Sequence, residues 1–317
     1  MKSVTFKNGD EFPVIGLGTW KAKTGEVGEA LLEALKMGYR HIDCAAIYAN
    51  EKEIGEALNQ AFKAGIVQRE DLFITSKLWN SAHLAEDAVK ACDQTLKDLQ
   101  LDFLDLYLVH WPVALRPEIG LGFPEKPEDF LSPEEAPIAA TWEVMEQLLD
   151  AGKARHIGVS NFNQSSIESL VRSCRIRPEV NQIELHPCLP QKELVNFCKS
   201  EGIHITAYSP LGSPDRSGRK DEDPSLFELE AVCAIAEAKG KSVAQILLAW
   251  IVNRGLTAIP KSTNPKRLRE NLEAAEIELS ADEMARISDS RIEHRFISGE
   301  FWAMDGSPYS LAKLWGR

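Results

Sequence analysis

The segment LFITSKLWNSAHLAEDAVKACDQTLKDLQLDFLDLYLVH, residues 72–110, carries the pattern on which the fold depends. Two β-rich runs, LFITSK ending at Lys77 and FLDLYLVH ending at His110, flank a stretch of helical period over residues 84–99. Apolar residues spaced three and four apart favour a helix, whereas runs of β-branched and aromatic residues favour strands. A strand, a helix and a strand in this order predict a βαβ unit with two parallel strands.

The same alternation continues on both sides of this segment. Further strands are predicted at VIGL near Val14, and ending at Asp43, at Ser160, around Gln182, near Ser209 and at Pro260. Helical stretches are predicted over residues 26–37, 51–63, 140–149, 165–171, 191–200, 226–239 continuing into 243–252, and 265–274. Eight strand–helix units in about 250 residues predict a closed (β/α)₈ barrel of the α/β class.

A doubly wound dinucleotide-binding sheet is the competing fold. Its fingerprint has three glycines between the first strand and the first helix. The corresponding segment here, GLGTWK at 16–21, has Trp20 close to where the third glycine should stand. We therefore favour the barrel, although other residues indicate a dinucleotide.

We expect one domain over residues 1–317, because no linker or repeat interrupts the alternation. Residues 1–14 are predicted to form a hairpin that turns at Asn8-Gly9. Long insertions at 112–137 and 211–224 follow strand ends, where a barrel keeps its ligands. The tail 290–317 is too aromatic for disorder, and we expect it to form a loop over the substrate.

Composition narrows the function. The formal net charge of -12 argues against a nucleic-acid partner, because phosphate backbones would be repelled. The chain shows no secretory signal and no apolar run of membrane-spanning length. Its six cysteines include no CxxC pair, which favours reduced thiols. We expect a cytoplasmic monomer without a metal ion, acting on a small molecule.

Four polar residues fall at three consecutive strand ends. Asp43, Lys77 and His110 end strands two, three and four, and Tyr48 follows Asp43 by five residues. Adjacent parallel strands lie about 4.8 Å apart, so Asp43 and Lys77 can pair. A cation beside the Tyr48 hydroxyl would lower a pKa that is ordinarily about 10 and make Tyr48 a general acid. Each residue alone is more often structural, but the four together favour catalysis.

A second group follows strands five to eight. Asn161 and Gln182, next to Ser160, can hydrogen bond to a carboxamide, and Tyr208 offers a ring for stacking. Lys261 and Arg267 flank the start of a helix, a position that favours phosphate. The alternative is an exposed helix start with ordinary surface cations. These residues indicate a dinucleotide site opposite the first group.

The chain resembles the aldo-keto reductase superfamily, most closely its aldehyde reductase and aldose reductase branch, over residues 16–279. The matching motifs are GLGTW (16–20), YRHIDCAAIY (39–48), EIGEAL (53–58), TSKLWN (75–80), LDLYLVHWP (104–112), GVSNFN (158–163), YSPLGS (208–213) and IPKS (259–262). The resemblance implies a catalytic tetrad of Asp43, Tyr48, Lys77 and His110, with NADPH or NADP⁺ extended across the barrel mouth.

The resemblance also implies the roles of individual cofactor residues. Gly18, Thr19 and Trp20 would lie near the nicotinamide ribose, with Asp43 beside them. Ser160, Asn161 and Gln182 would hold the carboxamide, and Tyr208 would stack on the ring. The pyrophosphate would lie under Ser209, Pro210, Leu211, Gly212, Ser213 and Asp215. The 2′-phosphate and adenine would contact Ile259, Pro260, Lys261, Ser262, Thr263, Arg267, Glu270 and Asn271.

The substrate pocket is predicted to be apolar. Trp20, Trp79 and Trp111 would form a throat above Tyr48 and His110, and Trp302 in the tail would close its outer rim. Deleting the tail after Arg295 should therefore alter selectivity more than NADPH affinity. Val113 stands where relatives often have a larger aromatic, and no arginine can be assigned to a substrate carboxylate.

The expected activity is NADPH-dependent reduction of aldehydes or ketones to alcohols, with Tyr48 as the proton donor. A non-catalytic NADP(H)-binding sensor or structural protein on the same fold is the alternative, although such a protein has no need of Tyr48. A sugar reductase that prefers NADH is a weaker alternative, because Lys261 and Arg267 favour NADPH.

Overall fold

A computed structural model describes residues 2–22, 25–216 and 218–316. Met1, within the predicted hairpin, and Arg317, within the predicted tail, lie outside the described residues, as do residues 23–24 and 217.

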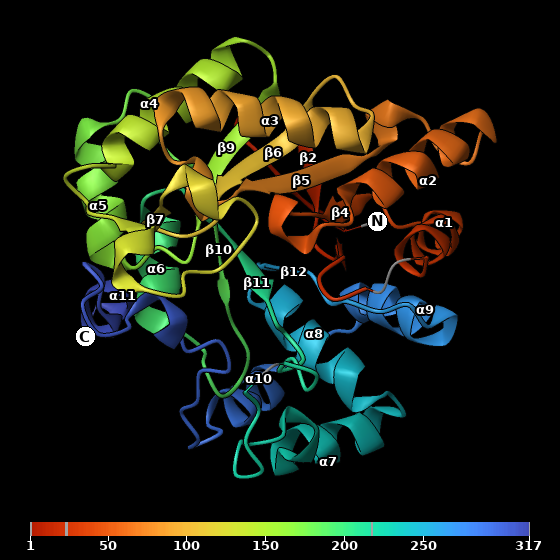
Figure 1. Ribbon diagram of the computed structural model, residues 1–317. Coiled ribbons are helices and arrows are strands. Elements are labelled where there is room, and N and C mark those ends of the chain that lie inside the picture. The colour runs from red at the N-terminus through yellow and green to blue at the C-terminus, as the bar shows by residue number, and fades with distance from the viewer. Residues whose placement is uncertain (1, 23–24, 217, 317) are drawn as a thin grey trace.

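Eight parallel strands form a closed barrel, as predicted (Figure 1). Along the chain they are β3 (Leu17–Gly18), β4 (His41–Asp43), β5 (Phe73–Leu78), β6 (Leu104–Val109), β9 (Ala154–Ser160), β10 (Val180–Glu184), β11 (His204–Tyr208) and β12 (Thr257–Ala258). Neighbours in sequence are neighbours in the sheet. Parallel bridges from Ile15 to Ala258 and from Gly18 to Lys261 join the first strand to the last.

Helices surround the strands (Figure 1). They are α1 (Val27–Met37), α2 (Glu51–Lys63), α3 (Ala85–Leu99), α4 (Ile138–Asp150), α5 (Gln164–Ser173), α6 (Lys192–Ser200), α7 (Glu230–Lys239), α8 (Val243–Asn253), α9 (Pro265–Glu273), α10 (Ala281–Ser288) and α11 (Leu311–Trp315). The first nine follow the predicted positions; α2 matches at both ends, and the ends of the others agree to within a few residues. The stretch predicted to begin at Leu226 opens instead with a 3₁₀ turn before α7.

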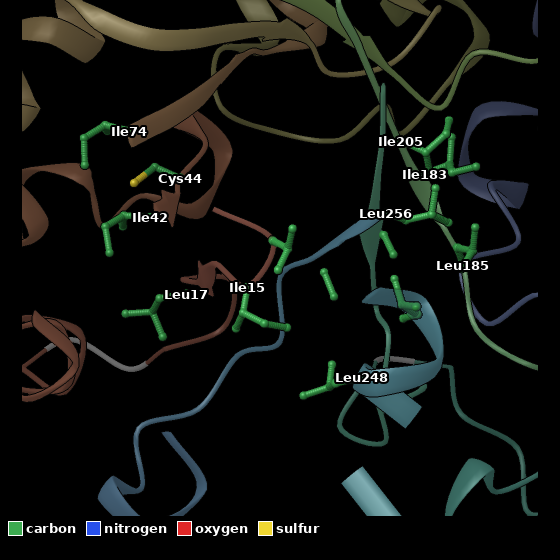
Figure 2. Close-up of a cluster of buried hydrophobic side chains, with 14 of the residues drawn as sticks. Ile15, Leu17, Ile42, Cys44, Ile74, Ile183, Leu185, Ile205, Leu248 and Leu256 are labelled. Carbon is green, nitrogen blue, oxygen red and sulfur yellow. The ribbon is translucent and has the colours of Figure 1, made fainter. Parts of the chain in front are cut away.

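Side chains alternate between the two faces of each strand, which separates the apolar core from the barrel interior. Figure 2 shows Ile42, Cys44 and Ile74 gathered on one side and Ile183 and Ile205 on another. These positions alternate with Asp43, Lys77 and Gln182, which belong to the opposite face. The apolar layer between sheet and helices thereby fixes the polar residues at the strand ends.

The predicted hairpin fills the N-terminal end of the barrel. Strand β1 (Ser3–Thr5) pairs antiparallel with β2 (Glu11–Pro13). Phe6 and Phe12 stack with ring centroids 5.3 Å apart and pack on Phe73, Leu106, Leu108 and Val180. With this end filled by aromatic side chains, a ligand site belongs at the opposite, C-terminal end.

The long 112–137 insertion and the tail pack together beside the barrel mouth. The insertion contains two short antiparallel strands, β7 (Ala114–Leu115) and β8 (Phe130–Leu131). The Tyr309 hydroxyl, in the tail, donates to the Leu131 carbonyl at 2.9 Å and accepts from the Ala114 amide at 3.0 Å. The tail is therefore part of the folded structure.

Candidate active site

A cavity of about 1550 Å³ opens at the carboxyl ends of the strands. It brings together residues from both predicted groups, from the ends of strands β3 to β12. Of the predicted residues, those that line it are Gly18, Thr19, Trp20, Asp43, Tyr48, Trp79, His110, Trp111, Ser160, Asn161, Gln182, Tyr208, Ser209, Pro210, Leu211, Ser213, Asp215, Ile259, Pro260, Lys261, Ser262, Thr263, Arg267, Glu270 and Asn271.

The four tetrad residues are in contact at the floor of this cavity. Lys77 Nζ donates to Asp43 Oδ1 at 2.5 Å, to the Cys44 carbonyl at 2.8 Å and to the Tyr48 hydroxyl at 3.5 Å. Both partners of the Lys77–Asp43 ion pair are fully buried. The His110 ring meets Tyr48 edge-on, with ring centroids 6.1 Å apart. Tyr48 reaches this place because a 3₁₀ turn, Ala46–Tyr48, begins three residues after the end of β4 at Asp43.

The pKa of Tyr48 differs from the sequence-based expectation. Burial raises the pKa of Tyr48 to about 12, although the adjacent Lys77 charge and hydrogen bond act in the opposite direction. The sequence predicts that Lys77 brings the pKa of Tyr48 below its ordinary value. This expectation is wrong because the free energy lost when a phenolate is removed from water exceeds the free energy gained from its attraction to one ammonium group. The Lys77 ammonium is in addition shared with Asp43.

Burial and charge also fix the state of the other tetrad members. Burial lowers the pKa of Lys77, but Asp43 and Tyr48 together raise it above its ordinary value, so Lys77 stays charged. Burial and the Lys77 charge hold the pKa of His110 well below its ordinary value. His110 is therefore a neutral imidazole at neutral pH. Among the described residues, nothing hydrogen bonds to its buried Nδ1.

The amide and hydroxyl groups of the second group form a network next to the tetrad. Gln182 Nε2 donates to Asp43 Oδ2 at 2.7 Å, and the Tyr208 hydroxyl donates to Asn161 Oδ1 at 2.8 Å. Asn161 Nδ2 donates to the His110 carbonyl at 3.0 Å. Asn161 adopts a left-handed backbone with φ of 64°, a conformation that asparagine tolerates better than most residues. The network leaves Gln182 Oε1 without a hydrogen bond in the described part of the chain.

Cationic side chains gather at the far end of the cavity. Lys21 Nζ donates to the Asp215 carbonyl at 2.8 Å and so ties the first strand's loop to the 209–216 segment. Burial lowers the pKa of Lys21; Asp215 opposes this effect, and the like charges of Arg216 and Lys261 add to it. Lys261 and Arg267 are exposed, and the described residues offer neither of them an ion-pair partner. This end of the cavity suits an anion.

The other half of the cavity is apolar, and here two predictions need correction. Trp302 is fully buried and does not line the cavity; it packs behind Trp79 and Trp111, with ring centroids 5.8 and 5.7 Å away. In the predicted pyrophosphate segment, Gly212 also lies outside the lining, and a Cβ added there would meet the Phe296 and Leu226 side chains. Lys77 is likewise covered and does not line the cavity, but its Nζ lies 3.5 Å from the Tyr48 hydroxyl, which does.

Sequence reasoning missed several lining residues in this half. They are Ile47, Leu121, Phe123, Ile297, Ser298, Glu300 and Phe301. Phe123 and Phe301 meet edge to face with ring centroids 5.4 Å apart. They come from the 112–137 insertion and the tail, which have no periodic pattern that would place single side chains. The sequence offered one indication of these residues: Leu121 and Phe123 are large apolar residues in a loop, and such residues often mark a binding surface.

Two further properties concern the described residues as a whole. Within residues 2–22, 25–216 and 218–316, none of the helices combines the length and apolar character that crossing a bilayer demands. Over the same ranges, no three His, Cys, Asp or Glu side chains meet in a way that could hold a metal ion.

Comparisons with known proteins agree with this geometry. The sequence profile described as "Aldo/keto reductase family" matches residues 14–292. An aldo/keto reductase of Synechocystis sp. is 49% identical over 317 aligned residues, covering 99% of this chain and 96% of that protein. Aldo-keto reductase family 1 member A1-A of Danio rerio is 43% identical, covering 93% and 91%. The structure of the aldose reductase from Schistosoma japonicum superposes with a TM-score of 0.86 at 42% identity, covering 94% and 95%.

Proposed function

Because the chain belongs to the aldo/keto reductase family and is therefore an oxidoreductase acting on small carbonyl compounds with a nicotinamide cofactor, we propose that it uses NADPH to reduce aldehydes and ketones to alcohols. The observation that carries this proposal is the position of the Tyr48 hydroxyl, 3.5 Å from the buried Lys77 ammonium at the floor of a large cavity. A protein that only binds a dinucleotide has no use for this arrangement.

The residues present fit NADPH. Tyr208 offers its ring to the nicotinamide, and the free Gln182 Oε1 and the Ser160 and Asn161 side chains can meet its carboxamide. Ser209 to Asp215, with Lys21, would cover the pyrophosphate. The mutual repulsion of Lys21, Arg216 and Lys261 favours an anion at that end. Lys261 and Arg267 would bind the 2′-phosphate, which supports NADPH over NADH.

NADPH, when bound, supplies the hydride that reaches the carbonyl carbon. The chain supplies the proton and the orientation. Tyr48 keeps its proton throughout the neutral range because its pKa is about 12, and it can pass that proton to the substrate oxygen as negative charge develops there. Lys77 then stabilises the resulting phenolate, and Asp43 holds Lys77 in place. A neutral His110 with its proton on Nε2 can donate a hydrogen bond to the same oxygen.

Exchange of Tyr48 tests the proposal directly. In Tyr48→Phe we expect NADPH consumption with an aromatic aldehyde to fall by about 10²–10⁴-fold, the usual contribution of a general acid. NADPH affinity, followed by quenching of tryptophan fluorescence, should change little, because only one hydroxyl is lost. Turnover close to that of the unmodified protein would rule out Tyr48 as the acid.

Tyr107→Phe is the matched control. Tyr107 lies on β6, and its buried hydroxyl has no hydrogen-bond partner within the described residues. The same chemical change at this position should leave turnover intact. If the unmodified protein binds NADPH but reduces no member of an aromatic, aliphatic, sugar and uronate panel, the non-catalytic sensor becomes the better explanation.

A further inference from the structure

Glu184 is a fully buried carboxylate at the end of β10, two residues beyond Gln182. It accepts two consecutive backbone amides of the tail: Phe296 N–H at Oε1, 2.7 Å, and Ile297 N–H at Oε2, 2.9 Å. His186 Nε2 lies 2.8 Å from Oε1 as well. Since an ionised carboxylate only accepts, His186 carries its proton on Nε2. The tail is thus attached to the barrel through both oxygens of one side chain.

The attachment depends on charge. An isolated carboxylate is very costly to bury, and its cost is offset here only by the donors around it. Burial raises the pKa of Glu184, but His186, Arg295 and the Phe296 amide together bring it below the ordinary value. Without the docked tail, the Glu184 carboxylate would lose the hydrogen bonds from the Phe296 and Ile297 amides, which stand in for the hydrogen bonds that water would otherwise donate. Docking of the tail and burial of Glu184 therefore stabilise each other.

The two attached residues, Phe296 and Ile297, begin the part of the tail that lines the cavity. Ile297, Ser298, Glu300 and Phe301 line its apolar half. The Phe301 ring meets Trp111 edge-on with centroids 5.8 Å apart and meets Phe123 at 5.4 Å. The position of the tail thus sets the spacing between the aromatic walls. Among the hydrogen bonds of the described residues, none joins Glu184 to a tetrad member.

We propose that Glu184 is a positioning residue that determines substrate specificity by fixing the tail wall, residues 296–301, of the carbonyl pocket. This inference rests on the proposed reductase function. It assigns to Glu184 no contact with substrate, cofactor or the reacting atoms. Its loss should therefore change which carbonyl compounds are accepted, while the reduction of a small aldehyde continues.

Glu184→Gln tests this with almost no change of shape. The new amide presents an N–H to at least one of the Phe296, Ile297 and His186 donors, so the carboxylate's attachment is partly lost. We expect the ratio of kcat/KM for 4-nitrobenzaldehyde over propanal to fall on the order of tenfold. The kcat with propanal should stay within about twofold of the unmodified value, because the tetrad is untouched. Glu184→Asp keeps the charge but not the reach, and should give a smaller loss.

Two comparisons separate positioning from a general structural role. Glu179→Gln removes a carboxylate that accepts from His156 at 2.6 Å at the opposite end of the barrel, and it should leave the ratio unchanged. Phe301→Ala removes the wall itself. Adding Glu184→Gln to Phe301→Ala should lower the ratio no further, because both changes act through the same segment.

Hydrogen exchange of the unmodified protein tests the attachment without a variant that has to fold. The Phe296 and Ile297 amides should be protected, in contrast to exposed amides such as Asp305. Three outcomes would each overturn the proposal. In Glu184→Gln, kcat/KM could fall equally for both aldehydes; the effects of Glu184→Gln and Phe301→Ala on the kcat/KM ratio could add; or the amides at 296–297 could be unprotected. If the unmodified protein reduces neither aldehyde, the proposed function fails, whereas protection at 296–297 that is lost in Glu184→Gln still shows that Glu184 holds the tail.

Discussion

At the level of single residues, the site is governed by opposition between burial and charge. The Lys77 ammonium lies 2.5 Å from Asp43 and 3.5 Å from the Tyr48 hydroxyl, so Asp43 takes the larger share of its charge. Burial then sets the pKa of Tyr48 at about 12 and holds that of His110 well below its ordinary value. Both groups therefore keep one protonation state across the neutral range. The proposed chemistry needs this, since Tyr48 must hold its proton until it is used.

Lys261 and Arg267 test cofactor preference at the same scale. We expect Lys261→Ala combined with Arg267→Ala to raise the Kd for NADPH by about ten- to a hundredfold, because charge-assisted bonds to the 2′-phosphate are lost. Both side chains are exposed, so solvent screens their attraction to the phosphate and limits the rise in Kd to that range. The Kd for NADH should change less than about threefold. Fluorescence titration measures both.

Lys266→Ala combined with Arg269→Ala is the charge-matched control. Both residues lie on α9, and neither lines the cavity. This variant should bind NADPH almost normally. Equal weakening of NADPH and NADH in the first variant, or equal weakening of NADPH in both variants, would mean that Lys261 and Arg267 do not recognise the 2′-phosphate.

At the level of elements, the two glycines of the GLG motif close the barrel. A Cβ at Gly18 would stand 2.7 Å from the Ile259 carbonyl oxygen, and one at Gly16 would meet the His41 ring at 2.5 Å. Glycine at position 18 allows the first strand to approach the end of the last strand, and glycine at position 16 leaves room for the His41 ring of β4. The motif that resembles a phosphate-binding fingerprint in sequence is here a point of contact between strands.

Most elements could be predicted because the periodicity of their apolar residues is strong and each element follows from local sequence. The proximity of Asp43, Lys77 and His110 could be predicted from these elements, since strand ends converge in any parallel barrel. Helices α10 and α11 were not predicted, although Ser280 with Glu283 forms a capping box and Ser310 caps α11. Helix α11 has five residues, too few for a period to show. The pairing of β7 with β8 joins residues from either end of a long loop, which no local pattern indicates.

The hairpin at the barrel floor should make stability depend on pH through His156. His156 Nδ1 lies 2.6 Å from Glu179 and Nε2 lies 2.9 Å from Asp10, on the hairpin. Burial lowers the pKa of His156, but Glu179 and Asp10 together raise it above the ordinary 6.5. Its contribution is complete below pH 6.5 and is lost as pH rises through the folded-state pKa.

Thermal unfolding from pH 6.5 to 8 measures this contribution. The Tm of the unmodified protein should fall relative to that of His156→Gln across this window, so that the difference between them narrows. His41, with a pKa of about 3, and His83 and His204, at about 4, are neutral in the folded state and destabilise it only as pH falls. A constant difference in Tm would show that His156 is not charged in the folded protein.

At the level of the whole molecule, barrel, insertion and tail share one aromatic cluster. Trp79, Trp111, Val113, Leu115, Phe130, Trp302 and Leu314 are all buried in it. Its members come from the residues that follow β5 and β6, from the 112–137 insertion and from the tail, so the proposed substrate wall and the fold are stabilised by the same contacts. The tail also meets the 209–216 segment, because the Arg216 guanidinium lies 4.6 Å from the Phe296 ring centroid. Contacts between such distant segments could not be predicted from periodicity.

Truncation after Arg295 should consequently lower the stability of the whole fold. From the sequence alone, we expect it mainly to alter selectivity, and the structure leads us to revise this. It removes Phe296, Trp302 and Leu314 from buried positions. Losing buried apolar side chains of this size costs about 2–5 kcal/mol each, and the total approaches the 5–15 kcal/mol typical of a whole protein. We expect the Tm to fall by about 10 °C or more, and NADPH affinity to fall as well, since Phe296 supports Arg216.

A shorter deletion, of residues 311–317, provides the graded comparison. It removes Leu314 and the rest of α11 but leaves Phe296, Phe301 and Trp302 in place. Its Tm should lie between those of the full chain and the longer truncation, with reduction of propanal retained. Differential scanning calorimetry and NADPH titration of the three proteins measure both quantities. If the longer truncation kept the Tm of the full chain, the tail would be a peripheral flap, and the shared cluster would not be what joins the substrate wall to the fold.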